Sequence, residues 1–173
     1  MSGEEALQVE VVAEHGPEIT DAALRSMRFA EAVVKETLRL EGPTQIVFRR
    51  ATADIDISGY HIRKGEKLLM NLGHVVAADE RWAAEDPGAF KPERWLCEAG
   101  HRTGAWVPFG LGPRMCSGMP LALNEMRVMV AVLARGYSFE LLEPGERWRS
   151  FPLMTPAHGM LLRFSALQAL QHC

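Results

Sequence analysis

Long hydrophobic runs, basic runs and an acidic tail are all absent from this 173-residue chain. No apolar run reaches the roughly 20 residues that a membrane-spanning helix needs, so we expect no membrane span in this chain. The opening stretch "MSGEEALQVEVVAEHG" is acidic and amphipathic, unlike the basic start and apolar core of a secretory signal. The formal net charge is −3 and the positive charges are scattered, which argues against nucleic acid as a partner.

Cysteine is scarce, and its odd count argues against a disulfide framework. The three cysteines are Cys97, Cys116 and Cys173. They lie far apart, with no C-x-x-C pair to indicate structural zinc, and such usage indicates a reducing compartment. A zinc site on His and Cys is the weaker alternative, because no candidate histidine is spaced i, i+4 or paired with a cysteine. The histidines considered are His61, His74, His101 and His158.

The composition that remains is that of an ordinary globular protein, with 47% hydrophobic and 24% charged residues. Apolar positions recur at helical spacing between Ser26 and Leu40, where "EGP" ends the predicted helix. The expected inward positions are Phe29 or Ala30, Val33 or Val34, Thr37 and Leu38. Met119–Gly136 predicts a second long helix, and shorter helices are expected over Glu4–Glu14 and near Asp21.

Short β-rich segments follow the first long helix, with "SG" and "KG" marking turns between them. They are Gln45–Thr52, Asp54–Ile57 and Tyr60–Ile62. The stretch "KLLMNLG" is apolar without a break and predicts a buried strand that enters a short helix. Alternation in "YSFELL" and "GMLLRF" predicts a terminal hairpin. The expected fold class is α+β, mainly helical with small β-sheets.

The segment Asp86–Gly104 has no period, and a loop of this length within a compact domain is uncommon and often functional. Beyond it, "FGLGPRMCSG" surrounds Cys116 with glycines just before a predicted helix. The helix dipole and exposed backbone N–H groups there favour the thiolate over the thiol. Gly110, Gly112 and Gly118 permit positive φ and close approach of a flat ligand. Arg114 offers a fixed charge to an anionic group on that ligand. A structural thiol in a glycine-rich loop remains the alternative.

Three motifs occur in a defined order along the chain. The cysteine loop fills every fixed position of the pattern F-x-x-G-x-R-x-C-x-G. Before it, "ETLR" places Glu36 and Arg39 on one face of the predicted helix. Taken alone, this spacing is equally typical of a solvent-exposed salt bridge. "PERW" places Arg94, whose planar fork can serve two acceptors, in the irregular segment. Together the motifs resemble the cytochrome P450 family, the haem-thiolate monooxygenases, over nearly the whole chain.

This resemblance implies the C-terminal portion of the cytochrome P450 fold, with its E-x-x-R helix, meander, cysteine loop and proximal helix. It implies haem b (iron protoporphyrin IX) as cofactor, with the Cys116 thiolate as axial iron ligand. Arg114 and Arg49 are expected to bind the haem propionates. The neighbouring Arg50 is the alternative to Arg49. The expected cofactor-binding set is completed by Phe109, Gly110 and Gly118.

The same resemblance implies that Glu36, Arg39 and Arg94 form a buried network that holds the segment leading to the cysteine. The residues near Val47 and the turn Met154–His158 are implied to face the substrate pocket. The implied reaction inserts one oxygen atom from O2 into a small lipophilic substrate. Electrons would come from an NADPH reductase or a ferredoxin on the proximal face.

Family members are much longer, and the matched motifs belong to their C-terminal part. Residues 1–173 are therefore expected to form a haem-binding part whose distal helix, with its acid–threonine pair, lies outside the match. No catalytic residue is assigned for that reason. The alternative is a truncated, inactive fragment that keeps the haem motifs. The expected location is the cytoplasm for a bacterial-like parent, or the endoplasmic reticulum surface for an anchored eukaryotic one.

Overall fold

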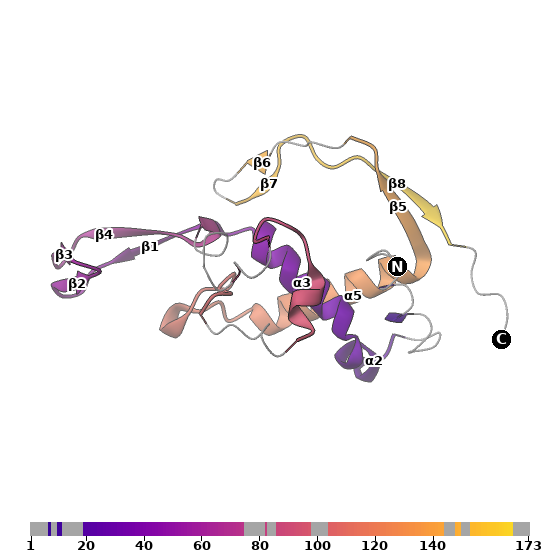
Figure 1. Ribbon diagram of the computed structural model, residues 1–173, viewed down its shortest axis with the longest axis horizontal. Coiled ribbons are helices and arrows are strands. Elements are labelled where there is room, and N and C mark those ends of the chain that lie inside the picture. The colour runs from indigo at the N-terminus through magenta and orange to yellow at the C-terminus, as the bar shows by residue number, and fades with distance from the viewer. Residues whose placement is uncertain are drawn as a thin grey trace.

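A computed structural model describes residues 7, 10, 11, 19–74, 82, 86–97, 104–143, 148–149 and 153–167. Its helical elements are α2 (Asp21–Ser26), α3 (Arg28–Glu41), η2 (Pro92–Trp95), η4 (Gly112–Arg114) and α5 (Met119–Gly136). Its strands are β1 (Ile46–Arg50), β2 (Ile55–Ile57), β3 (Tyr60–Ile62), β4 (Lys67–Asn71), β5 (Tyr137–Leu141), β6 (Trp148–Arg149), β7 (Thr155–Pro156) and β8 (Leu162–Ala166). Figure 1 shows α3 and α5 crossing at the centre, with strand ribbons extending from both sides. The predicted mixture of helices and small sheets is confirmed.

The starts of α2 and α3 are each held by a side chain that lies outside the helix. Thr20 caps the preceding α2, because its hydroxyl accepts a hydrogen bond from the Ala23 N–H at 3.1 Å. Met27 then leaves the helical conformation, so the helix predicted from Ser26 begins at Arg28, and the short helix predicted near Asp21 is confirmed as α2. The Glu10 carboxylate accepts the N–H groups of Phe29 and Ala30 at 2.7 and 2.9 Å. Of the helix predicted over Glu4–Glu14, residues 7, 10 and 11 are helical and the others lie outside the described residues.

The buried face of α3 is partly apolar and partly charged. Its buried members are Phe29, Ala30, Ala32, Val34, Glu36, Leu38 and Arg39. Thr37, predicted to point inward, is exposed, and its hydroxyl donates to the Val33 carbonyl at 2.8 Å. The predicted helical spacing was correct, but the buried face includes Glu36 and Arg39 in place of Thr37. These two charged side chains can be buried because they form an ion pair with each other.

Four two-stranded antiparallel sheets account for the described strands. β1 pairs with β4 to form one two-stranded ribbon. β2 pairs with β3, and this second hairpin lies at the end of the β1–β4 ribbon, as Figure 1 shows. The strand predicted from "KLLMNLG" exists and leads into helical residues 72–74. Its predicted burial is wrong, since Leu69 and Met70 are 57% and 44% exposed. A two-stranded ribbon has two open faces, and no described element covers β4. The predicted terminal hairpin is confirmed by β5 and β8.

The buried core is divided into small clusters. The first joins α2, α3 and α5 through Val11, Ala23, Met27, Ala30, Ala131 and Ala134. The second gathers Ala32, Trp82, Trp95 and Ala105, with Trp106 packed against it. The predicted helix Met119–Gly136 is confirmed as α5. Its side chains Leu121, Val128, Met129 and Val132 are 38–64% exposed, so α5 presents an apolar face that the described residues leave open.

Candidate functional site

The loop before α5 is closed by its own backbone around a cysteine. The Cys116 N–H donates to the Phe109 carbonyl at 2.9 Å, and the Met115 N–H donates to Gly112 at 3.0 Å. Gly110 and Gly112 have φ of 74° and 70°, a region that side chains with a Cβ rarely adopt. The path of the loop therefore requires glycine at positions 110 and 112, whereas the positive φ expected at Gly118 is not found, since its φ is −81°.

The thiol of Cys116 is exposed and free, and α5 begins three residues later at Met119. The Met119 N–H donates to the Cys116 carbonyl at 3.3 Å, which ties the loop to the first turn of the helix. A Cβ added at Gly118 would lie 3.7 Å from the Cys116 Sγ, in ordinary van der Waals contact. The alternative of a buried structural thiol does not describe this side chain.

Apolar and cationic groups flank the thiol. Leu111 and Met115 are 59% and 46% exposed on the loop itself. Arg114, also exposed, closes η4 and has no ion-pair partner among the described residues. One soft sulfur donor, exposed apolar side chains and an available guanidinium fit a flat apolar ligand that carries a metal and acidic groups.

Arg49 and Arg50 lie apart from this loop, on strand β1. Successive strand side chains point to opposite faces, so the two arginines cannot share one role. The Arg49 guanidinium donates to the Phe48 carbonyl at 2.9 Å, and Arg50 donates to the Gly65 carbonyl at 3.5 Å. Among the described residues, no hydrogen bond joins either arginine to the cysteine loop. Their expected roles at the propionates stay predictions.

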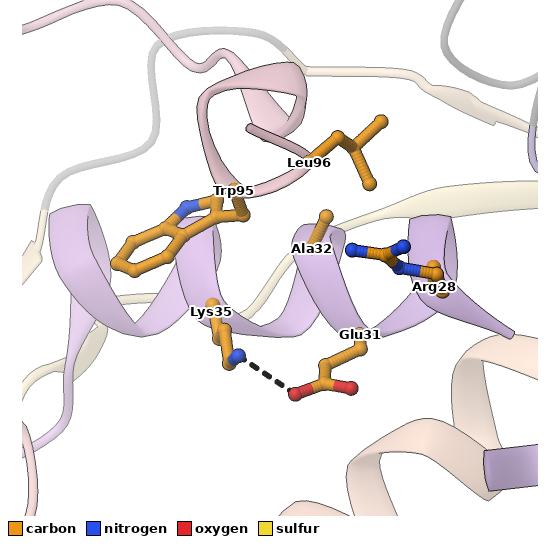
Figure 2. A pocket seen from close by; sticks show the side chains of 6 residues that line it. All are labelled: Arg28, Glu31, Ala32, Lys35, Trp95 and Leu96. Carbon is orange, nitrogen blue, oxygen red and sulfur yellow. Dashed lines mark ion pairs between the residues drawn. The ribbon is translucent and has the colours of Figure 1, made fainter. Parts of the chain in front are cut away.

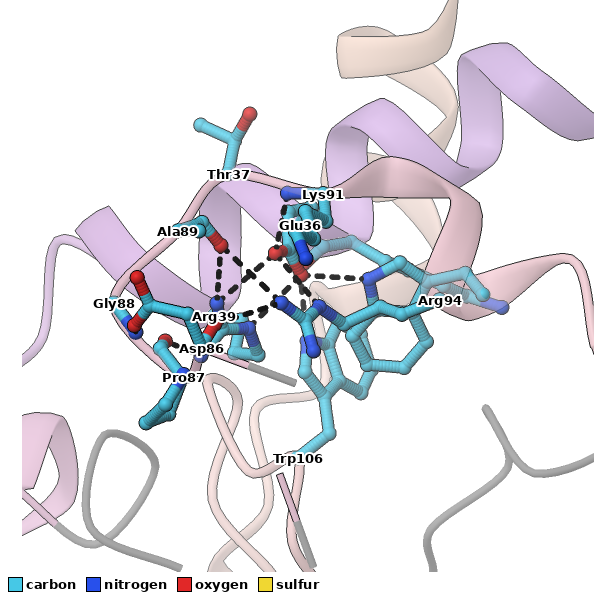
Figure 3. Close-up of polar contacts among 12 residues, drawn as sticks. Glu36, Thr37, Arg39, Asp86, Pro87, Gly88, Ala89, Lys91, Arg94 and Trp106 are labelled. Atoms are coloured by element: carbon cyan, nitrogen blue, oxygen red, sulfur yellow. Dashed lines mark hydrogen bonds and ion pairs between the residues drawn. The ribbon is translucent and has the colours of Figure 1, made fainter. Parts of the chain in front are cut away.

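Glu36, Arg39 and Arg94 meet as the sequence motifs suggested, in a buried network drawn in Figure 3. The Glu36 Oε2 accepts the Arg39 Nε at 2.8 Å, and its Oε1 accepts the Arg39 Nη2 at 2.9 Å. The Arg94 Nε donates to the same Oε1 at 2.9 Å. Such charge-assisted bonds between planar groups are the strong ones in proteins.

Further donors complete the shell around the Glu36 carboxylate. The backbone N–H of Lys91 and the indole N–H of Trp95 each donate at 2.9 Å. Burial alone raises the pKa of Glu36, but the bonds from Arg39, Lys91 and Trp95 outweigh it. The pKa of this carboxyl therefore lies below its ordinary value, and the group stays ionised.

The two arginines also donate hydrogen bonds to backbone carbonyl groups of the irregular segment. Arg39 donates to the carbonyls of Pro87 and Ala89 at 2.7 and 3.2 Å. Arg94 donates to Asp86 and Ala89 at 3.3 and 3.2 Å. Figure 3 shows these carbonyls turned towards the guanidinium groups. Residues 86–89 are thereby fixed without regular secondary structure.

A row of aromatic rings joins this network to the cysteine loop. Ring centroids are 5.3 Å apart for Trp82 and Trp95, 5.8 Å for Trp95 and Trp106, and 6.2 Å for Trp106 and Phe109. The Trp106 indole also donates to the Lys35 carbonyl at 3.1 Å. Sequence reasoning named Trp95 only as part of "PERW" and missed the row. The tryptophans stand alone in the sequence, without a period that would have revealed it.

The alternative of a zinc site gains no geometric support. Among the described residues there is no group of three or more His, Cys, Asp or Glu able to hold a metal ion. His61 instead contacts Asp56 across the β2–β3 hairpin at 3.0 Å. His101 lies outside the described residues. None of the helices in the described part of the chain combines the length and the hydrophobicity that a membrane span requires.

Comparison with known proteins gives a consistent result. The family model for cytochrome P450 matches residues 4–164. The (21S)-21-acetyl-1-hydroxy-apo-melianone synthase of Melia azedarach is 33% identical over 165 residues, which are 95% of this chain and 33% of that protein. The flavonoid 3'-monooxygenase of Arabidopsis thaliana is 32% identical over 143 residues, which are 78% of this chain and 27% of that protein.

A solved structure shares the arrangement of the elements. Cyanobacterial CYP120A1 with bound retinoic acid superposes with a TM-score of 0.87 at 26% sequence identity. The match covers 95% of this chain and 39% of the other. The chain therefore spans about a third or less of the curated relatives compared above, and less than half of the solved one.

Proposed function

Because this chain belongs to the cytochrome P450 family, we propose that it is the haem-binding C-terminal part of a monooxygenase. The reaction inserts one oxygen atom from O2 into an organic substrate. The observation that carries the proposal is the free, exposed thiol of Cys116 on a backbone-closed glycine loop directly before α5.

In this proposal the Cys116 thiolate would bind the iron of haem b. A thiolate-bound haem would supply the chemistry of O2 activation, because the thiolate donates electron density to the iron. Arg114, which has no ion-pair partner among the described residues, would neutralise one propionate, and Arg49 would bind a second one in place of the Phe48 carbonyl. Gly110 and Gly118 carry no side chain that would keep the porphyrin from the loop, and Phe109 would complete the cofactor-binding set.

The Glu36 network serves this site from a distance. Its arginines fix residues 86–89, and the row from Trp82 to Phe109 transmits that rigidity to the loop. A metal ligand needs a supporting shell to hold its orientation. We therefore assign Glu36, Arg39 and Arg94 a positioning role, and no catalytic one.

The remaining components of a monooxygenase are proposals drawn from the family. Electrons come from an NADPH reductase or a ferredoxin on the proximal face, and the substrate is small and lipophilic. The location follows the parent protein, in the cytoplasm or on the endoplasmic reticulum surface. Within this chain no residue is assigned to proton delivery to oxygen.

A second candidate is a fragment that keeps the haem motifs without turnover. Two observations favour it. The chain spans 27% and 33% of the two curated relatives, and α5 and β4 expose large apolar side chains such as Met129, which is 61% exposed. Such surface is usually covered in a working protein.

An optical spectrum of the purified chain tests the ligand assignment. The chain is supplied with haem, reduced and exposed to carbon monoxide, and the expected result is a strongly red-shifted Soret band. Cys116→Ser should abolish that band. Cys97→Ser is the matched control, since Cys97 is exposed and its one hydrogen bond among the described residues goes to the Arg94 carbonyl at 3.4 Å, so its change should leave the band intact. A red-shifted band that survives Cys116→Ser would refute the assignment.

Turnover separates the two candidates. With an electron donor and a lipophilic substrate, product formation by the 173-residue chain would support the enzyme. A thiolate-type spectrum without product would support the fragment. A spectrum of free haem would refute haem binding by this chain.

A further inference from the structure

The segment Ala105–Phe109 leads into the cysteine loop without helix or strand structure. Its small side chains are nevertheless packed on two sides of the molecule. Ala105 is buried in the cluster that contains Ala32, and Val107 packs against Leu72. Such apolar contacts hold the segment in place, but they are not directional and do not fix its orientation.

Trp106 supplies the directional contact. Its indole N–H donates to the Lys35 carbonyl of α3 at 3.1 Å, and Figure 3 shows its side chain pointing towards that helix. Among the described residues this is the one hydrogen bond between Ala105–Phe109 and α3. The Lys35 side chain takes no part, because Figure 2 shows it turned to Glu31, with its Nζ 2.7 Å from the Glu31 Oε1. The acceptor is therefore the backbone of the helix.

Two further contacts lead from Trp106 to the cysteine. The rings of Trp106 and Phe109 meet edge to face, with centroids 6.2 Å apart and planes at 68°. The Trp95 ring lies on Trp106 as well, at 5.8 Å, so the indole is held by ring contacts and by its N–H. The Phe109 carbonyl in turn accepts the Cys116 N–H at 2.9 Å.

We infer that Trp106 is a positioning residue for Cys116. The indole N–H fixes the ring on α3, the ring fixes Phe109, and the Phe109 carbonyl fixes the Cys116 backbone. The place of the sulfur follows from that backbone, because a single side-chain torsion joins the two. A metal ligand needs this kind of support from groups that do not touch the metal. The use of this order for iron rests on the proposed function, whereas the order itself belongs to the chain without haem.

Backbone order parameters from NMR relaxation of the full chain without haem test the inference. In wild type the Cys116 amide should be rigid, with an order parameter of about 0.85. Trp106→Phe keeps an aromatic ring but removes the donor, and it should lower this value towards about 0.6. The amides of Ala131 and Ala134, which are buried on α5, should keep their values.

This readout separates positioning from a general contribution to stability. A residue that only stabilises the fold would leave the Cys116 order parameter of the folded chain unchanged, and that result would overturn the inference. An equal fall at Ala131 and Ala134, or a wild-type Cys116 value already below about 0.6, would overturn it too. Trp148→Phe is the matched control, since Trp148 is 41% exposed on β6, and it should leave Cys116 as rigid as in wild type.

Phe109→Leu tests the next contact of the series and does not touch the indole donor. It should also lower the Cys116 order parameter. The double variant with Trp106→Phe should be no more mobile there than the more mobile single variant, because both changes interrupt one series of contacts. A double effect equal to the sum of the single effects would show two independent supports and overturn the series.

A spectrum of the haem-loaded chain connects this order to the ligand. After reduction and exposure to carbon monoxide, Trp106→Phe should lower the ratio of the red-shifted band to the ordinary band by about two- to tenfold, as loss of one neutral hydrogen bond allows. Trp148→Phe should keep the wild-type ratio. An unchanged ratio in Trp106→Phe would overturn the role towards iron. Absence of the red-shifted band in wild type would refute the proposed function instead, and the order parameters would still decide the role of Trp106.

Discussion

The Arg94 Nε lies 2.9 Å from the Glu36 Oε1, although 58 positions separate the two residues along the chain. This bond joins helix α3 to a segment that has little regular secondary structure. Because Arg39 binds the same carboxylate, one buried side chain of α3 organises both guanidinium groups. The stability of the irregular segment should therefore depend on the presence and the ionisation of the Glu36 carboxylate.

Glu36→Ala should lower the free energy of unfolding by about 3–5 kcal/mol, because it leaves two buried arginines without a counter-charge. Urea unfolding followed by circular dichroism measures this loss. Glu140→Ala is the control, since Glu140 pairs with Arg163 on the surface with 65% and 62% of the side chains exposed. That change should cost at most about 1 kcal/mol. Similar costs at the two positions would contradict the role given to the network.

Stability should fall on acidification because of Glu36. Its pKa in the folded chain lies below the ordinary value of 4.5, so its contribution is complete above about pH 4.5. The contribution is lost as pH falls from there through the folded pKa. Glu31 acts in the same direction, whereas burial raises the pKa of Glu41, which acts in the opposite one.

Urea midpoints measured between about pH 6 and pH 3 test this dependence. The wild type should lose stability as pH falls below about 4.5, and Glu36→Gln should show a flatter profile in that window. Glu41→Gln, which removes the opposing group, should show a slope at least as steep as that of the wild type. A Glu36→Gln profile parallel to the wild type would show that another group carries the acid sensitivity.

The indole N–H groups of Trp95 and Trp106 should contribute differently to the free energy of unfolding. Trp95→Phe removes a bond to the ionised Glu36, and such bonds contribute about 1.5–3 kcal/mol. Trp106→Phe makes the same change of ring but removes a bond to the neutral Lys35 carbonyl, with about 0.5–1.5 kcal/mol expected. Urea unfolding of both variants gives the comparison. A larger loss for Trp106→Phe would contradict the importance of the carboxylate.

Two glycine substitutions should have effects of opposite sign. Gly112 has φ of 70° with open space around it, so Gly112→Ala should cost about 1–2 kcal/mol through backbone strain alone. Gly136 has open space and no positive φ at the last position of α5. Gly136→Ala should gain about 0.4–1 kcal/mol.

Thermal unfolding measures both effects, and haem titration should show weaker binding for Gly112→Ala alone. Equal haem affinity in the two variants would show that the loop does not need its positive φ to bind the ligand.

Much of the local structure followed from the sequence because it depends on neighbours in the chain. The bounds of α5 agree with the prediction because a proline in its first turn and Gly136 at its end act locally. The β5–β8 hairpin likewise followed from alternation. Burial of β4 was predicted wrongly, because an unbroken apolar run indicates a buried strand only where other elements cover it.

The candidate site shows the same division. The motif around Cys116, the pair Glu36 and Arg39, and the residue Arg94 were all identified from short patterns. Positive φ was predicted correctly for Gly110 and Gly112 but wrongly for Gly118, whose φ is −81° at the N-cap of α5. The row of tryptophans, the cap that Glu10 places on α3 and the pairing of Glu31 with Arg127 were not predicted.

The sequence by itself determined the family, the cysteine loop and the helix that follows it, since those depend on residue type at fixed spacing. The tertiary structure alone decided the charge contacts that no motif indicated, such as the ion pair of Glu31 with Arg127, and it left Arg28 without an ion pair among the described residues. The reason is physical. A charge removed from water is stable only beside its partner, and a partner far along the chain is brought to it by the fold.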